Sequence, residues 1–221
     1  MDLMEGIFAV NKPAGITSHT VVSIVRRATG VKRVGHGGTL DPFAIGVLVI
    51  AVGRENTKKL SQFVKGEKEY EAEIMLGKVS TTDDPDGEIT EKEVKNIPEL
   101  TEIKTAVASF IGTILQTPPI YSSLKINGKP AHRRVRNGEE VVLKPRQIEI
   151  RSIEILSYKY PILNLKITTG PGVYIRAIAR DLGEKLGTGG YLTALKRIRV
   201  NTFTIDQAIN IEDLKQQNQA L

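Results

Sequence analysis

The sequence predicts an α+β fold built around one mixed, mainly antiparallel sheet flanked by helices. Its 221 residues, 40% of them hydrophobic, are enough to bury a substantial core. Segments with strand-like alternation and segments with helical periodicity follow one another without a regular βαβ rhythm, which favours a mixed sheet over a fully parallel one. No repeat, low-complexity stretch or linker divides the chain. We therefore expect a single domain over residues 1–221.

Each predicted element has a local signature. The opening GIFAVNKPAG is typical of a strand that ends at proline and glycine, and Thr17-Ser18 offers a cap for the helix that follows. Gly30 then ends that helix. Residues 68–76 alternate strictly, with Tyr70 on the apolar face. In chain order we expect an opening strand, a helix over 19–29, a buried strand over 45–52, a helix over 55–63, a strand over 68–76, a helix over 98–111 with Ile103, Val107, Phe110 and Ile111 inward, strands over 147–157 and 162–168, and a helix after Gly172.

Composition excludes several classes of site. The chain has no cysteine, so disulfides, thiolate nucleophiles and cysteine-bound zinc or iron are excluded. Its three histidines are far apart in sequence, which disfavours a histidine-built metal site. The longest apolar run, 47–52, is too short for a membrane helix, and the N-terminus lacks the pattern of a signal peptide. We expect a cytoplasmic protein without metal or cofactor.

Nearly all of the excess positive charge lies in one segment. The formal net charge is +6, and residues 125–146 hold seven Lys and Arg against two Glu. Asn127-Gly128 and Asn137-Gly138 are strong turn signals, so this segment should form a protruding hairpin or loop. It is either a solvated surface loop or a phosphate-binding element, because clustered cations release counterions from nucleic acid.

The glycine-rich segment 35–42, GHGGTLDP, is the strongest candidate for a functional loop. It matches neither a phosphate-binding P-loop nor a dinucleotide fingerprint. Pro42 biases Asp41 toward an extended conformation, which could point a carboxylate out of a rigid loop; an ordinary Asp-Pro turn is the alternative. His36 is either an exposed turn residue or an imidazole that stacks on bases.

Two further positions have both a structural and a functional interpretation. Tyr70 is either a core residue or, if its face opens into a cleft, a ring that stacks on a base and a hydroxyl that transfers a proton. Arg176 and Arg180 share one helix face. They could pair with Asp181 or Glu184 at the surface, or one of them could pair with a buried carboxylate and keep it ionised.

Several of these motifs together resemble one family. The blocks GHGGTLDPFAIGVLVIAVGRENTK, KEYEAEIMLG, TTDDPDGEI, PPIYSSLKINGK and GVYIRAIARDLGEKLGTGGYLTALKR occur in the order expected of the TruB family of tRNA pseudouridine synthases. The opening NKPAGITSH is similar to the first block of that family. The resemblance covers about residues 7–205, which is nearly the whole chain.

The resemblance implies the pseudouridine synthase fold and isomerisation of uridine 55 in the T-loop of tRNA. It implies a catalytic role for Asp41, and for Tyr70 both stacking on the target base and a catalytic role as a base. It also implies pairing of Arg176, the third catalytic residue, with the aspartate. Tyr174 and Leu195 resemble residues of the uridine pocket, and His36 resembles a histidine that enters the T-loop. The partner is then the T-arm of tRNA, with no cofactor and no obligate protein partner. The basic segment 122–146 resembles a thumb-like insertion that clamps the T-arm, with Lys125, Lys129, Arg133, Arg134 and Arg136 as RNA contacts.

The chain departs from the family pattern in three places. Gly37 stands where relatives often have threonine, and AHRRVR replaces a stretch in which many relatives have a tyrosine. Only IEDLKQQNQAL follows the last matched block, so we expect no C-terminal RNA-binding domain. Two other functions remain open: an RNA-binding or tRNA-folding protein without catalysis, and a synthase that depends on a guide RNA.

Overall fold

A computed structural model describes residues 5–122, 124–126, 129–130, 134, 139 and 141–217. The described strands form a large mixed sheet in the order β14-β1-β3-β12-β4-β11-β10-β7, with β2 paired to β3 and β13 to β12. Strand β1 pairs with β14, and β12 with β3, in parallel. The pairs β1–β3, β2–β3, β10–β7 and β12–β13 are antiparallel. The predicted α+β fold with a mixed, mainly antiparallel sheet is confirmed.

The chain divides into two compact units. The first contains 1–71, 167–172 and 194–221, and the second contains 72–166 and 173–193. Three strands contribute residues to both units: β4 (Lys68–Leu76), β11 (Ile162–Thr169) and β12 (Gly190–Val200). The expectation of a single catalytic domain remains a prediction.

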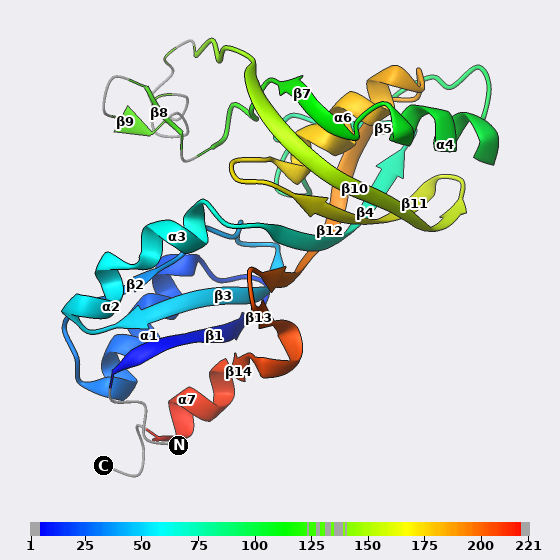
Figure 1. Cartoon of the computed structure of the whole chain (residues 1–221). Helices are drawn as coiled ribbons and strands as arrows, with labels where there is room; N and C mark the ends of the chain where they lie inside the picture. The colour runs from blue at the N-terminus through cyan, green and yellow to red at the C-terminus, as the bar shows by residue number, and fades with distance from the viewer. Residues whose placement is uncertain are drawn as a thin grey trace. The chain divides into compact units, whose positions relative to one another are not determined.

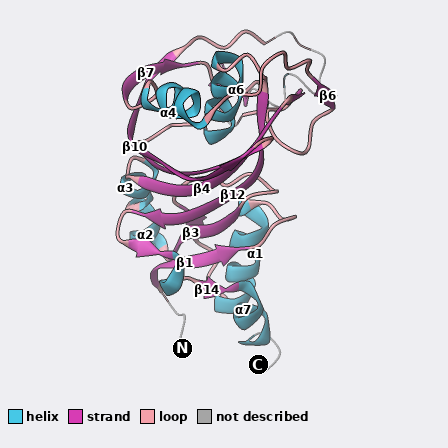
Figure 2. Cartoon of the chain, turned by 90° about the vertical axis from the view of Figure 1, so that its right-hand side faces the viewer, coloured by secondary structure: helices cyan, strands magenta, loops and turns pink. Residues whose placement is uncertain are grey.

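The first unit buries both faces of its central strand, β3. Leu48 and Ile50 pack into one cluster with residues of α1 and α7, while Val47 and Val49 pack with Phe63 of α3 on the other face. Figure 2 shows α1 and α7 on one side of β1 and β3, and α2 and α3 on the other. The elements are β1 (Gly6–Lys12), α1 (Ser18–Thr29), β2 (Val34–His36), β3 (Ile45–Val52), α2 (Arg54–Lys58), α3 (Leu60–Val64), β13 (Phe203–Thr204), the 3-10 helix η1 (Ile205–Gln207), β14 (Ile209–Asn210) and α7 (Ile211–Gln217).

In the second unit, α4 lies against the long strand β10 (Figure 1). Helix α4 contacts both β10 and α6, and the inward residues Ile103, Val107 and Ile178 are buried. Its elements are β5 (Lys78–Ser80), β6 (Ile89–Glu91), α4 (Leu100–Ala108), β7 (Gly112–Gln116), β8 (Lys125–Ile126), β9 (Lys129–Pro130), β10 (Arg146–Lys159) and α6 (Ile175–Lys185). Strands β8 and β9 pair in antiparallel orientation, while the Asn127-Gly128 turn signal between them lies outside the described residues.

Local signals located most elements correctly. Helix α1 begins after Thr17, whose side chain accepts a hydrogen bond from the Thr20 backbone, and it ends at Gly30, whose φ is 66°. The predicted strands over 45–52 and 68–76 have those bounds, and β4 alternates between buried and half-buried residues.

Two expectations were wrong in detail. The helix predicted over 55–63 is interrupted at Lys59, whose backbone N–H donates to the Asn56 carbonyl in a tightened last turn. Ile111, predicted to face inward, is 46% exposed, because α4 ends at Ala108 and the chain turns toward Gly112.

Gly183 in α6 lies against the backbone that leads into β12. A Cβ atom at this position would overlap the backbone of Gly189 and Gly190. Replacing glycine by alanine inside a helix normally stabilises the helix by about 1 kcal/mol, whereas overpacking costs about 1–3 kcal/mol. The steric cost should therefore exceed the gain in helix propensity. We expect Gly183→Ala to lower the melting temperature. The matched control is Gly6→Ala, where a Cβ would meet nothing within 4 Å; equal melting temperatures for the two variants would contradict the prediction.

Candidate active site

The glycine-rich segment forms β2 and then a loop fastened to the body of the first unit. The Gly37 N–H donates to the Val49 carbonyl at 2.8 Å, which extends the pairing of β2 with β3. Ser18 of α1 fixes the middle of the loop: its hydroxyl oxygen accepts from the Leu40 N–H at 2.9 Å and lies 3.1 Å from the Leu40 carbonyl, to which it donates. Leu40 is buried. The loop therefore holds the next residue, Asp41, in a defined place.

Lys12, at the end of β1, binds the last residue of this loop and the chain that follows β1. Its side chain is fully buried, and its Nζ donates to the carbonyls of Pro13 at 2.8 Å, Ile16 at 2.8 Å and Pro42 at 3.1 Å. Burial lowers the pKa of Lys12 to about 8, while the nearby Asp41 carboxylate acts in the opposite direction. A buried ammonium group thus lies close enough to Asp41 for the two charges to interact.

Arg197 of β12 binds the middle of the loop and the adjacent strand β3. Its guanidinium is buried and donates to the carbonyls of Val47 at 2.8 Å, Gly38 at 3.0 Å and Thr39 at 3.4 Å. Its charge adds to the effect of burial on Lys68, whose pKa falls to about 8. Lys12, Arg197 and Lys68 therefore surround the loop with buried positive charge, which favours the ionised form of a carboxylate there.

Sequence reasoning missed these three cations. For Lys68 a signal was available, because it falls on the same face of the alternating strand as Tyr70. A cation in register with apolar residues is a candidate for a buried charge that binds backbone carbonyls. Its Nζ donates to the Gly66 carbonyl at 2.7 Å and to the Val64 carbonyl at 2.9 Å.

Four of the predicted site residues lie in the first unit. Asp41 is partly exposed, whereas Tyr70 and Leu195 are 6% and 7% exposed. His36, at the end of β2, packs edge-on against His19 with ring centroids 5.5 Å apart. Burial, assisted by the charges of His19 and Arg197, lowers the pKa of His36 to about 4, so its ring is neutral at pH 7.

Arg176 lies in the second unit, where it pairs with a buried carboxylate. Its guanidinium donates to Asp84 at 2.8 Å and to the carbonyls of Tyr121 at 2.9 Å and Thr82 at 3.0 Å; the side chains of Arg176 and Asp84 are 4% and 6% exposed. One of the two arginines of this helix does leave the surface, as the second interpretation proposed. Asp84 was not among the predicted site residues. The pairing of Arg176 with Asp41 remains a prediction.

Arg180 takes the surface role. It donates to Asp83 at 2.9 Å and also to its neighbour Asp181. Burial raises the pKa of both carboxyl groups, and Arg180 opposes that shift. This pair holds the 81–84 loop against α6, next to the buried Arg176–Asp84 pair.

Tyr174 is fixed by its backbone at the start of α6. The buried side chain of Gln116 accepts from the Tyr174 N–H at 2.9 Å and donates to the Tyr174 carbonyl at 3.1 Å. The guanidinium of Arg146 lies 5.1 Å from the centre of the Tyr174 ring. The sequence contained no local signal for this use of Gln116.

The basic insertion is described only in part. Lys125 and Lys129 lie on β8 and β9, and Arg134 pairs with Glu139 at 2.9 Å. The predicted RNA contacts Arg133 and Arg136 lie outside the described residues.

Two further kinds of feature, a metal site and a membrane-spanning helix, are absent from the described residues. Nowhere in that part of the chain do three His, Cys, Asp or Glu side chains gather closely enough to hold a metal ion. No helix among the described residues is both long and apolar enough to cross a membrane.

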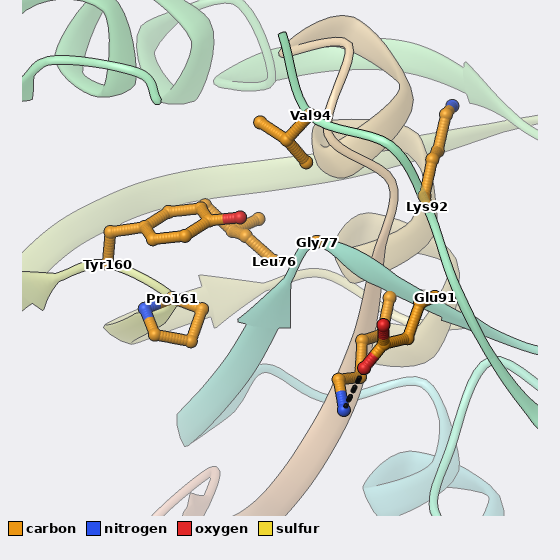
Figure 3. Close-up of a pocket in the computed structure, with 8 residues that line it drawn as sticks. Leu76, Gly77, Glu91, Lys92, Val94, Tyr160 and Pro161 are labelled. Atoms are coloured by element: carbon orange, nitrogen blue, oxygen red, sulfur yellow. Dashed lines mark ion pairs between the residues drawn. The ribbon is translucent and has the colours of Figure 1, made fainter. Parts of the chain in front are cut away.

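A hollow of about 280 Å³ lies elsewhere in the second unit (Figure 3). Lys78 and Glu91 form an ion pair of 3.2 Å at its wall, and the Tyr160 ring faces Gly77. None of the predicted site residues lines this hollow.

Known proteins match both units of this chain in sequence. A sequence model of the TruB family pseudouridylate synthase N-terminal domain matches residues 26–175, and one of the tRNA pseudouridylate synthase B C-terminal domain matches residues 176–220. The chain is 45% identical to tRNA pseudouridine synthase B of Corynebacterium diphtheriae, covering 96% of this chain and 73% of that protein. It is 44% identical to tRNA pseudouridine synthase B of Desulfotalea psychrophila, covering 96% of this chain and 89% of the relative.

Among solved structures, the chain is similar to one in a Cbf5-Nop10-Gar1 complex, with a TM-score of 0.76 and 27% identity. That alignment covers 98% of this chain and 55% of the solved one. The predicted pseudouridine synthase fold is thereby confirmed. The glycine-rich loop 35–42, which we call the Asp41 loop, and the helix that carries Arg176 both lie inside the matched regions. The chain belongs to the TruB family of pseudouridylate synthases.

Proposed function

We propose that this chain isomerises uridine 55 in the T-loop of tRNA to pseudouridine, with Asp41 as the catalytic carboxylate. The observation that carries the proposal is the Asp41 loop, residues 35–42. Buried Lys12 and Arg197 fasten it through three of its carbonyls and bind three more carbonyls in the flanking chain. Relatives named tRNA pseudouridine synthase B, at 41–45% identity over nearly the whole chain, support the choice of substrate.

The reaction is a rearrangement within one nucleoside. The bond between C1′ and N1 breaks, a bond between C1′ and C5 forms, and the proton on C5 is lost while N1 gains one. Nothing is oxidised or reduced, and no group is donated. The ionised Asp41 either attacks the nucleoside or assists departure of the base from the ribose. In both routes a fixed carboxylate next to buried cations is the required group.

The uridine must leave its loop before it can react. Extruding a base costs a few kcal/mol, and stacking on an aromatic ring returns about 1–3 kcal/mol. We assign this stacking to Tyr70 and the apolar wall of the pocket to Leu195, with Tyr174 as a further pocket residue. His36 enters the T-loop as a neutral ring, which avoids bringing a desolvated charge among the bases.

Arg176 is assigned the role of partner to Asp41. Its other donors already bind Asp84 and two backbone carbonyls, so its guanidinium has little freedom to turn. A preorganised cation keeps a carboxylate ionised without reorganisation during the reaction.

The proposed partner is the T-arm of tRNA, bound with the help of the 122–146 insertion, and the proposed place of action is the cytoplasm. A synthase that depends on a guide RNA and on further proteins is the second candidate, because the solved chain in the Cbf5-Nop10-Gar1 complex has the same fold. The higher identity to the tRNA pseudouridine synthases B, 45% against 27%, favours an enzyme that acts alone. Conversion of uridine 55 in a bare tRNA transcript by the purified chain decides between them.

Asp41→Asn should abolish turnover and leave binding nearly intact. The amide keeps the shape of the side chain but removes the negative charge that the reaction needs. We expect release of tritium from [5-³H]uridine in tRNA to fall by at least about 1000-fold, which corresponds to about 4 kcal/mol of barrier. Filter binding of the same tRNA should change little; residual turnover near the wild-type rate would remove Asp41 from the chemistry.

Asp84→Asn should slow the reaction through Arg176. The amide still accepts a hydrogen bond, but a bond to a charged partner is worth about 1.5–3 kcal/mol and an ordinary one about 1 kcal/mol, so a loss of about tenfold in kcat is expected.

The matched control for Asp84→Asn is Asp86→Asn, in the same loop and exposed. Its turnover should equal that of the wild type. We expect Asp84→Asn to lower kcat. If Arg176 contributes only to stability, the variant will instead have a lower melting temperature and an unchanged kcat, which would contradict the prediction.

The low pKa of His36 should be visible by NMR. We expect its ring to titrate with a midpoint of about 4, and His19→Ala to move the midpoint upward because a neighbouring charge and part of the burial are lost. Ser23→Ala, an exposed change on the same helix, should leave it in place. Since the folded ring binds its proton less readily than the unfolded chain, stability should fall as the pH drops from about 6.5 toward 4. A wild-type midpoint near 6.5 would show that the ring is not desolvated.

A further inference from the structure

Four exposed cations of the first unit lie outside the 125–146 segment and close to one another. They are Arg26 at the end of α1, Lys32 and Arg33 before β2, and Arg54 at the start of α2, and we name them the edge patch. The sequence hides this group, because residues 26–33 (RRATGVKR) carry four positive charges and no negative one, while acidic residues elsewhere cancel them in the total.

Backbone contacts bring the edge patch together. The Gly53 N–H donates to the Arg33 carbonyl at 2.8 Å, which continues the antiparallel register of β2 and β3. Lys32 and Arg54 are the next residues beyond this bond, and α2 begins at Arg54. The Arg26 Nε donates to the Lys32 carbonyl at 3.1 Å, which places the third guanidinium beside the same turn.

Local stability does not explain this arrangement. Like charges that lie close together repel one another. Among the described residues, no carboxylate lies within ion-pair distance of the edge patch. Glu5 lies against Gly53 nearby, and Glu55 is paired with Lys58 at 2.7 Å. The patch therefore keeps its excess charge at the surface.

Two residues of the edge patch, Lys32 and Arg33, come directly before the strand that carries His36. Lys32 is four positions before His36, which is at most about 13 Å of extended chain. An RNA strand that presents its loop to His36 therefore passes within a few nucleotides of the patch. Clustered cations at that distance from a base-contacting residue match a phosphate backbone.

We propose that the edge patch binds phosphates of the tRNA stem-loop that carries the target uridine. This inference rests on the proposed function for its choice of RNA. It adds a second phosphate-binding surface, on the body of the first unit, to the one expected in the 122–146 insertion. The contacts are to the backbone and carry no information on base sequence.

The test compares two triple variants with the same change in charge. The first is Lys32→Gln/Arg33→Gln/Arg54→Gln, and the matched control is Lys92→Gln/Lys95→Gln/Lys104→Gln, three exposed lysines of the second unit. Filter binding of a T-arm hairpin is measured between 50 and 400 mM salt. The edge variant should lower the slope of log K against log salt by roughly 2–3, because each lost phosphate contact removes about 0.7–0.9. The control should keep the wild-type slope.

The melting temperature separates binding from folding. Since neutralisation removes like-charge repulsion, the edge variant should melt at or above the wild-type temperature while it binds RNA more weakly. A slope equal to that of the control overturns the inference. If the triple variant does not fold, Lys32→Gln alone should lower the slope by about 0.7–0.9, and an unchanged slope there overturns it equally.

Failure of the proposed function gives a different result. If the wild-type chain binds the hairpin but forms no pseudouridine in tRNA, the assigned reaction is wrong, and the salt slopes still decide whether the edge patch contacts RNA. If the wild type forms pseudouridine but the edge variant and the control variant have the same salt slope, the proposed function stands and only the inference about the edge patch is rejected.

Discussion

The site depends on two buried cations that bind backbone carbonyls rather than a surface ion pair. Removing a charge from water costs several kcal/mol unless hydrogen bonds replace its solvation. Lys12 and Arg197 each recover this cost through three carbonyl oxygens, and half of these six lie in the loop around Asp41. The same bonds that satisfy the cations therefore fix the loop, and the charge that remains favours an ionised Asp41. Rigidity and electrostatics at this loop have one physical source.

The second unit solves a related problem with a different arrangement. Arg176 is buried at the start of α6, and Asp84 neutralises it while two carbonyls take further donors. A buried pair of this kind adds little net stability, but loss of one partner is costly because a charge is left uncompensated. Its value is positional: the guanidinium is held in one orientation by groups that belong to its own unit. Arg180 and Asp83 support the loop from the surface side.

Sequence reasoning found what local patterns encode and missed what distant contacts decide. The alternation of 68–76 and the Thr17 cap predicted β4 and the start of α1 because those signals act over a few residues. The Arg197 contact with Val47 spans 150 residues, and the Arg176 contact with Asp84 spans 92, so no periodicity could reveal either. Resemblance to a family named Asp41 and Arg176, whereas only the structure identified the side chains that hold them.

Phosphate contacts and loop contacts serve different purposes in the proposed complex. The cost of extruding a uridine exceeds or equals what stacking on Tyr70 returns, so part of the free energy must come from contacts made before the base leaves its loop. Phosphate contacts can supply this, because they form equally well on any sequence and draw the RNA to the surface. In this proposal the choice of nucleotide falls to the loop that runs from His36 to Asp41. A basic insertion and a second cationic surface therefore increase affinity without relaxing the selection made at the loop.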